Sequence, residues 1–135
     1  MMTEEQLLAQ AADDYMNAEQ IAFFEELLTA KATSIRERIA GNHTLCMIER
    51  QPDVADTAST EEDRAKALRL IDMDNENLKR IRLALEAIAD GTYGYCADLG
   101  DPIGLKRLFI LPESLLSVDA MQARETRSKH QRDAA

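Results

Sequence analysis

The sequence from Asp53 to Asp90 contains neither glycine nor proline, and this uninterrupted stretch limits the folds that the chain can adopt. Glycine and proline are the main breakers of helices, so the whole stretch is free to be one helix. Apolar residues recur along it in near-heptad spacing, at Ala67, Ile71, Leu78, Ile81, Leu85 and Ile88. Asp74 falls on the same stripe and is its weakest position. We therefore predict a long amphipathic helix over about residues 57–89.

A second long helix is predicted upstream, over about residues 17–50. Its apolar residues recur at steps of three and four, which line one helical face, at Ile21, Phe24, Leu28, Ala32, Ile35 and Ile39. Neither helix can bury its stripe alone. The connection around Pro52 is rich in Asp, Thr and Ser, which favour turns. We therefore expect an antiparallel coiled-coil hairpin over residues 21–89, with its tip at about residues 51–58.

The chain after Asp90 loses this periodicity. Residues 90–112 are punctuated by glycine and only partly apolar, which predicts a small, compact, irregular globular region. A C-terminal helix is expected to begin near Pro112 or Glu113, within a segment over residues 113–135 whose end is basic. Residues 1–20 are expected to pack on the globular region. The predicted fold class is mainly α.

The stretch GYCADLG, residues 94–100, reads like the first half of a zinc knuckle without its second ligand. Cys96 is followed three residues later by Leu99, and no other cysteine follows. A structural zinc site needs four ligands, so these residues predict none. We expect an apolar cluster to stabilise the region in place of an ion. The expected members of this cluster are Leu99, Leu105, Leu108, Leu115, Leu116 and Met121.

The charge of the chain limits its partners. It carries 16 basic and 25 acidic residues, a net charge of -9, which disfavours direct binding to DNA or RNA. Its apolar runs are too short to span a membrane and its first residues are acidic, so we expect a cytoplasmic protein. No motif of the common enzyme classes is present, and we do not expect an enzyme.

Acidic side chains gather at the expected hairpin tip, where Asp53 and Asp56 lie within the connection. Carboxylates at the end of a helical stalk suit a metal ion or a basic pocket in a partner. An ordinary polar turn that caps the second helix also explains them, and the spacing alone favours this simpler explanation. The basic residues at and near Arg80 and Arg107 could bind an anionic ligand or an acidic patch of a partner. Solvated helix faces and ion pairs within the protein also explain them.

Four features together resemble the DksA/TraR family of RNA polymerase-binding transcription factors. They are P-D-x-x-D-x-A at residues 52–58, D-G-x-Y-G-Y-C at 90–96, G-x-P-I-G-L-x-R-L at 100–108, and the final helix. The resemblance covers nearly the whole chain. It implies that the hairpin tip enters the secondary channel of bacterial RNA polymerase, and that Asp53, Asp56 and Ala58 act there.

The resemblance also bears on zinc. The four cysteine positions of the zinc-binding members fall on Cys96, Leu99, Ser117 and Ala120 here, so three of the four ligands are absent. The chain is therefore most similar to the zinc-independent paralogues of DksA. This similarity implies a degenerate zinc-finger-like region at residues 90–112 that holds no metal.

A further implication of the resemblance is an effector, the alarmone ppGpp, bound at the interface with polymerase. Arg80 matches a basic position of that site, and Arg107 lies in a matching run that would contact polymerase or ppGpp. Met73 and Met121 stand at two other basic positions of the family. The affinity for ppGpp is therefore left open.

The expected function is regulation of transcription initiation by a monomer that binds no DNA directly. It would inhibit ribosomal RNA promoters together with ppGpp, without a zinc cofactor. Two alternatives remain open at this point. One is a transcript-cleavage factor that uses the same acidic tip, and the other is a coiled-coil adaptor for an unrelated protein.

Overall fold

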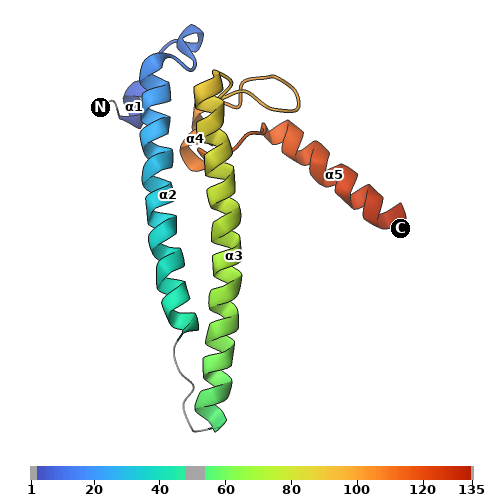
Figure 1. The fold of residues 1–135 in the computed structure, drawn as a ribbon. Helices are drawn as coiled ribbons and strands as arrows, with labels where there is room; N and C mark the ends of the chain where they lie inside the picture. Colours follow the sequence, from blue (N-terminus) through green and yellow to red (C-terminus); the bar gives the residue numbers. More distant parts are fainter. Residues whose placement is uncertain (1–2, 48–53, 135) are drawn as a thin grey trace. The chain divides into compact units, whose positions relative to one another are not determined.

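The computed structural model describes residues 3–47 and 54–134, with the side chains of all of these except residues 12, 54–59, 133 and 134. The elements in chain order are α1 (Glu4–Leu8), the 3-10 helix η1 (Ala12–Asp14), α2 (Ala18–Cys46), α3 (Val54–Asp90), α4 (Leu105–Ile110) and α5 (Val118–Ala134). Outside the helices, an isolated antiparallel bridge joins Tyr95 to Pro102. The arrangement in Figure 1 confirms the predicted mainly helical fold class.

The chain divides into two compact units. The head unit combines residues 1–28 with residues 82–135, and the hairpin unit is Thr29–Ile81. Because α2 and α3 each run from one unit into the other, each helix contributes residues to both units. Each unit has buried residues of its own.

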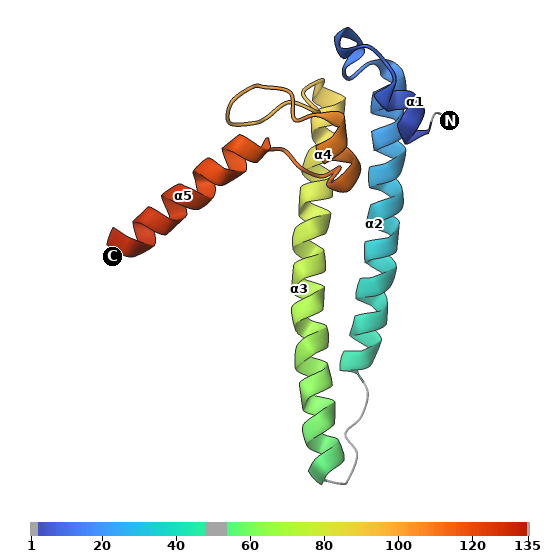
Figure 2. The ribbon, with the colours of Figure 1, turned by 180° about the vertical axis from the view of Figure 1, so that it is seen from behind.

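The hairpin unit is built from the two long helices, which run antiparallel and side by side in Figures 1 and 2. Its buried apolar side chains are Ala32, Ile35, Ala67, Ile71 and Ile81. All five belong to the two stripes that the sequence predicts, so the apolar periodicity of both helices is confirmed. Each large side chain buried in this way contributes about 1.5–3 kcal/mol to stability.

The head unit has an aromatic core. All three phenylalanines of the chain, Phe23, Phe24 and Phe109, lie in one cluster with Tyr93. Phe24 is fully buried at the centre, and its ring centroid lies 5.4–5.7 Å from those of the other three. Edge-to-face and offset contacts at these distances add to the stabilisation that burial provides.

The N-terminal segment is attached to the glycine-rich part of the head unit. Leu7 of α1 is fully buried. The Tyr15 hydroxyl donates to the Gly94 carbonyl oxygen at 2.5 Å and accepts from the Gly104 N–H at 3.0 Å. One side chain thus joins two turns that lie far from it in sequence.

The sequence prediction is wrong for residues 105–117. Part of the stretch expected to be irregular is the short helix α4, and α5 begins at Val118 instead of near Pro112. The Leu115 carbonyl accepts from the Ala97 N–H at 2.8 Å, and the Leu116 carbonyl accepts from Arg107 Nε at 3.0 Å. These long-range contacts hold the segment before Ser117 in a non-helical conformation, and α5 begins at Val118.

The predicted leucine and methionine cluster is also wrong in part. Leu108 is fully buried, but Leu99 and Met121 are exposed, by 55% and 38%. The remaining members, Leu105, Leu115 and Leu116, are half-buried. Leu99 lies in a tight turn in which the Gly100 N–H donates to the Cys96 carbonyl at 2.8 Å. The aromatic cluster, together with Leu7, supplies the core that Leu99 does not.

Candidate functional site

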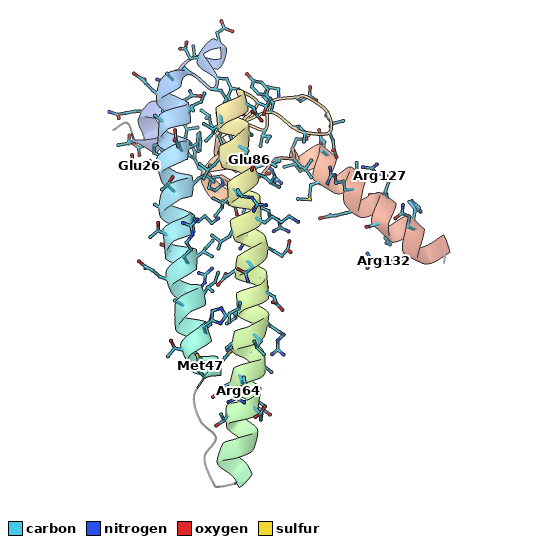
Figure 3. The ribbon with its side chains drawn as sticks, viewed as in Figure 1. Glu26, Met47, Arg64, Glu86, Arg127 and Arg132 are labelled. Carbon is cyan, nitrogen blue, oxygen red and sulfur yellow. The ribbon has the colours of Figure 1, made fainter. Side chains whose placement is uncertain are left out.

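The predicted tip lies at the boundary of the described structure. Asp53 is outside the described residues, and the side chains of Asp56 and Ala58 are outside them as well. The backbone of both residues belongs to α3, which starts at Val54 and therefore earlier than predicted. Asp56 thus falls in the first turn of the helix, where the macrodipole favours a negative charge. Met47 and Arg64, which are labelled in Figure 3, lie toward the tip-side end of the hairpin unit.

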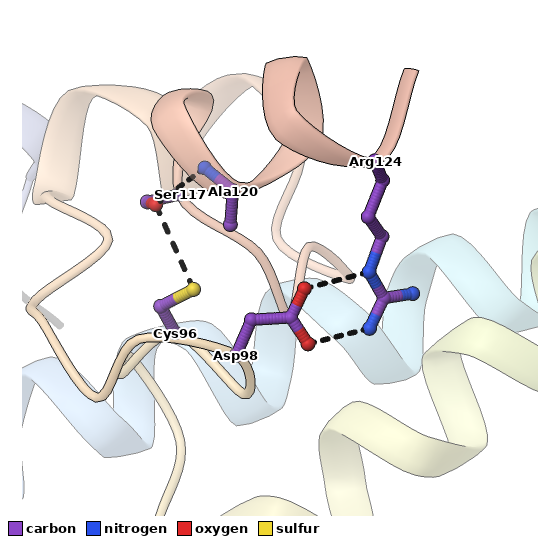
Figure 4. Close-up of polar contacts among 5 residues, drawn as sticks. All are labelled: Cys96, Asp98, Ser117, Ala120 and Arg124. Atoms are coloured by element: carbon purple, nitrogen blue, oxygen red, sulfur yellow. Dashed lines mark hydrogen bonds and ion pairs between the residues drawn. The ribbon is translucent and has the colours of Figure 1, made fainter. Parts of the chain in front are cut away.

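Three of the four positions matched to zinc ligands, Cys96, Ser117 and Ala120, are connected by hydrogen bonds in the head unit (Figure 4). Ser117 Oγ lies 3.6 Å from Cys96 Sγ and accepts from the Ala120 N–H at 3.2 Å. Ser117 therefore caps the start of α5 while its hydroxyl contacts the sulfur. Cys96 and Ala120 are buried, whereas the Leu99 side chain faces solvent. Residues 96–100, called the knuckle turn below, form a tight turn closed by the Gly100 N–H, which donates to the Cys96 carbonyl at 2.8 Å.

The Cys96 sulfur accepts several hydrogen bonds that favour its thiolate. The backbone N–H of Ser117 has the largest effect, and the backbone N–H groups of Leu99 and Asp98 and the Ser117 hydroxyl add to it. Together they lower the pKa of the Cys96 thiol to about 7, against the opposing effect of burial. The turn around Cys96 therefore stabilises negative charge on the sulfur.

Cys96 is expected to titrate near neutral pH in the folded protein. Following the ultraviolet absorbance of the thiolate in a Cys46→Ala protein should give a pKa of about 7. In denaturant the thiol should return to about 8.5. Because the folded pKa is the lower one, the thiolate stabilises the fold above the unfolded pKa, and this contribution is lost as the pH falls through 7. An unshifted pKa in the folded protein would contradict the hydrogen-bonding geometry.

An ion pair fastens α5 to the knuckle turn. Arg124 Nε and Nη2 donate to the two carboxylate oxygens of Asp98 at 2.7 and 2.6 Å (Figure 4). The Arg124 guanidinium holds the pKa of the Asp98 carboxyl below its usual range. Residues 121–132 of α5 are all exposed, and they include Arg127 and Arg132, which are labelled in Figure 3.

The residues of the knuckle do not fit a zinc ion. Cys96 supplies one thiol and Ser117 one hydroxyl, while Leu99 and Ala120 have no ligand atom in their side chains. Among the side chains that the structure describes, no group of three or more from His, Cys, Asp or Glu is placed to hold a metal ion. Structural zinc requires four such ligands at about 2.0–2.3 Å.

The two predicted basic residues lie in different units. Arg80, in the hairpin unit, is exposed, and its Nη1 donates to Asn77 Oδ1 at 3.4 Å. Arg107, in the head unit, is half-buried and donates to the Leu116 carbonyl. Met73 is 63% exposed. Arg107 therefore has a role in the fold itself, because it holds the turn that leads to α5.

The sequence identified Asp74 as a weak position but missed its partner. Arg38 Nε and Nη2 donate to the two Asp74 oxygens at 2.8 and 2.6 Å, across the hairpin. This contact lowers the pKa of the Asp74 carboxyl, although burial opposes the shift. Arg38 follows Ile35 by three residues, at the edge of the apolar stripe of α2. A basic residue at the edge of the α2 stripe, facing an acidic residue on the α3 stripe, is the sequence signal that could have identified the Arg38–Asp74 pair.

None of the helices in the described part of the chain is long and apolar enough to cross a membrane.

No family model matches the sequence. The chain is 39% identical over 123 residues to the RNA polymerase-binding transcription factor DksA of Caulobacter vibrioides. The aligned region covers 90% of this chain and 87% of that protein. The protein of the same name from Escherichia coli is 32% identical over 119 residues, covering 87% of this chain and 79% of its own length.

Among solved structures, the chain is similar to the transcription factor DksA2 from Pseudomonas aeruginosa. The TM-score is 0.82 at 40% sequence identity. The match covers 95% of this chain and 100% of that one. Sequence and fold therefore match the same group of proteins over almost the full length of the chain.

Proposed function

Because the chain belongs to the DksA/TraR family of RNA polymerase-binding transcription factors, we propose that it binds bacterial RNA polymerase and regulates transcription initiation. The observation that carries this function is the 39% identity over 90% of the chain to a protein named for binding RNA polymerase. A net charge of -9 supports a protein partner over a nucleic acid. We also propose that the protein is a monomer, that it is located in the cytoplasm, and that it has no enzymatic activity of its own.

The proposed mechanism assigns the decisive contact to the hairpin tip. The tip would enter the secondary channel and bring Asp53 and Asp56 near the active-site elements of polymerase, with Ala58 beside them. Their charge would shorten the lifetime of weak promoter complexes without contact to promoter bases. Ribosomal RNA promoters would respond most. Support comes from the match of residues 52–58 to the family's tip motif.

The proposed effector is ppGpp, bound where the protein meets polymerase. Arg80 is exposed and its Nη1 donates to Asn77 Oδ1 over a long 3.4 Å, so its guanidinium is accessible to a phosphate. Arg107 donates one bond to the Leu116 carbonyl through Nε, and its remaining donors would contact polymerase or ppGpp. Met73 and Met121, two uncharged residues, weaken the expected response to ppGpp.

We further propose that the protein works without zinc. The knuckle turn is held by hydrogen bonds to the Cys96 sulfur and by the Asp98–Arg124 pair, and the aromatic core lies in the same unit. These contacts perform the role that an ion has in a small metal domain, where zinc contributes an apparent ~10–16 kcal/mol. The proposal also explains why three ligand positions tolerate apolar or hydroxyl side chains.

Removal of metal is expected to change neither folding nor activity. A chelator should leave the melting temperature unchanged, and metal analysis of the purified protein should find far less than one zinc per chain. A chelated zinc-binding relative serves as the control and should lose stability under the same conditions. Stoichiometric zinc, or a marked fall in melting temperature on chelation, would contradict zinc independence.

An Asp56→Asn protein is expected to bind polymerase normally but to lose its effect on promoters. Hydrogen bonds to a charged group contribute about 1.5–3 kcal/mol, so the shortening of promoter-complex lifetime should weaken about tenfold or more. The measurement is the lifetime of complexes on a ribosomal RNA promoter, with affinity for polymerase measured in parallel.

Glu62→Gln is the matched control for this variant. It removes the same charge from an exposed position of α3 six residues further along the chain. We expect this protein to act like the parent. If Asp56→Asn retains full inhibition, or if both variants lose it equally, the proposed role of the tip is wrong.

A further inference from the structure

Arg38 and Asp74 make a directional contact between the two helices of the hairpin unit. The guanidinium meets the carboxylate with two hydrogen bonds of 2.6 and 2.8 Å. Asp74 is only 4% exposed and lies on the apolar stripe of α3 with Ala67 and Ile71, whereas the Arg38 side chain is 55% exposed. A buried carboxylate therefore depends on one guanidinium that reaches it from the surface of the other helix.

The tip-side half of α2, after this contact, packs weakly. None of residues 36–47, all of them described, is buried, and only Ile39, Asn42 and Cys46 are half-buried. Gly41 lies in the same half, and a Cβ added there would meet nothing within 4 Å. A contact across the hairpin on this side, from Cys46 Sγ to the Arg64 carbonyl, is long at 3.9 Å.

Apolar packing alone specifies the alignment of two helices poorly. Apolar stripes repeat about every 3.5 residues, so a shifted pairing can still bury apolar side chains. One turn of such a shift moves a helix by about 5.4 Å along its axis. The same shift would separate Arg38 from Asp74 and leave a buried carboxylate without its partner, which is strongly unfavourable. The ion pair therefore distinguishes one alignment from the others.

We propose that the Arg38–Asp74 pair is a positioning pair that fixes the alignment of the tip-side halves of α2 and α3. The proposal deepens the proposed function and rests on it, because the chain connecting these halves carries the residues proposed to act in polymerase. In this proposal the pair acts through the alignment of the helices and not through direct contact with polymerase or promoter. The pair determines how the end of α2 at Cys46 lies relative to the start of α3 at Val54. These two helix ends are the points to which the connection is attached.

The test is a protein in which both partners are replaced by leucine, Arg38→Leu with Asp74→Leu. The double substitution removes the buried carboxylate together with its partner and leaves no unpaired charge, so the melting temperature should not fall. Its alignment should nevertheless loosen. If the aligned conformer falls to about a tenth of the molecules, the effect on promoter lifetime falls about tenfold. Affinity for polymerase should change far less.

Spin labels measure the alignment directly. One pair of labels, at Thr44→Cys and Lys66→Cys, reports on the tip-side half, and a second pair, at Thr33→Cys and Lys79→Cys, reports on the other half. All four positions are exposed, and the native Cys46 and Cys96 are replaced by alanine. In the leucine protein the distance distribution of the first pair should broaden or shift by about 5 Å, one helical turn. The second pair should keep a single narrow distribution.

The reversed pair, Arg38→Asp with Asp74→Arg, separates positioning from the mere presence of polar groups. It should restore a narrow tip-side distribution and a large part of the promoter effect. A leucine protein with narrow distributions and full promoter inhibition would overturn the proposal, as would equal broadening at both label pairs. The distance measurements need no polymerase, so they decide the alignment even if the unmodified protein fails to act on promoters.

Discussion

Replacing Phe24 by alanine is expected to lower the free energy of unfolding by about 3–5 kcal/mol. Phe24 is fully buried, and its ring contacts Phe23, Tyr93 and Phe109 at once. The substitution removes the centre of the aromatic core and leaves a cavity that the surrounding rings can only partly fill. A domain of this size is stabilised by about 5–15 kcal/mol in total, so the loss is a large share. Urea unfolding followed by circular dichroism measures it.

Phe23→Ala is the matched control. Phe23 carries the same ring in the same cluster but is only half-buried. Its loss should therefore cost clearly less than that of Phe24. Equal losses from the two variants, or a loss below about 1 kcal/mol for Phe24→Ala, would show that the aromatic cluster is not the core of the head unit.

The second large effect is expected at Gly94, where alanine should lower the free energy of unfolding by about 2–4 kcal/mol. Gly94 has a φ of 91°, a left-handed conformation that alanine adopts only with strain. An added Cβ would also lie 2.6 Å from both Cγ and Sδ of Met16. The Met16 backbone is held in place, with a φ of 56° and an N–H that donates to Gln20 Oε1 at 2.7 Å, so the Met16 side chain itself must move away from the added Cβ.

Gly100→Ala separates the two causes. Gly100 has a similar φ of 78°, but an added Cβ would meet nothing within 4 Å. Its substitution should cost about 1–2 kcal/mol, for backbone strain alone. The difference between the two variants then measures the collision with Met16. If both cost the same, the N-terminal segment does not pack against Gly94 as described.

The sequence predicted the two long helices well because helical periodicity is a local property. The burial of Phe24, Ile35 and Ile71 follows from apolar spacing along one face, whatever the partner. The start of α5 was missed because it depends on distant contacts. The carbonyls of Leu115 and Leu116 accept from Ala97 and Arg107, and no pattern within residues 112–117 reveals this.

The candidate site was predictable to different degrees. The absence of three zinc ligands is evident in the sequence, but the exposure of Leu99 and the donors around the Cys96 sulfur depend on the folded turn. Asp74 could be identified as unusual, whereas its pairing with Arg38 requires the alignment of both helices. The roles of Asp53 and Asp56 rest on the family resemblance, because composition and spacing alone favour a simple polar turn.

The central claim is that this protein acts on RNA polymerase during initiation and does so without zinc. The measurement that tests it most directly is the lifetime of polymerase complexes on a ribosomal RNA promoter. The protein is prepared with a chelator and added at saturating concentration, with and without ppGpp. We predict that the protein shortens the lifetime of these complexes by itself and more strongly with ppGpp. A lifetime that stays unchanged in both conditions, while a zinc-loaded relative shortens it in parallel, would contradict the account.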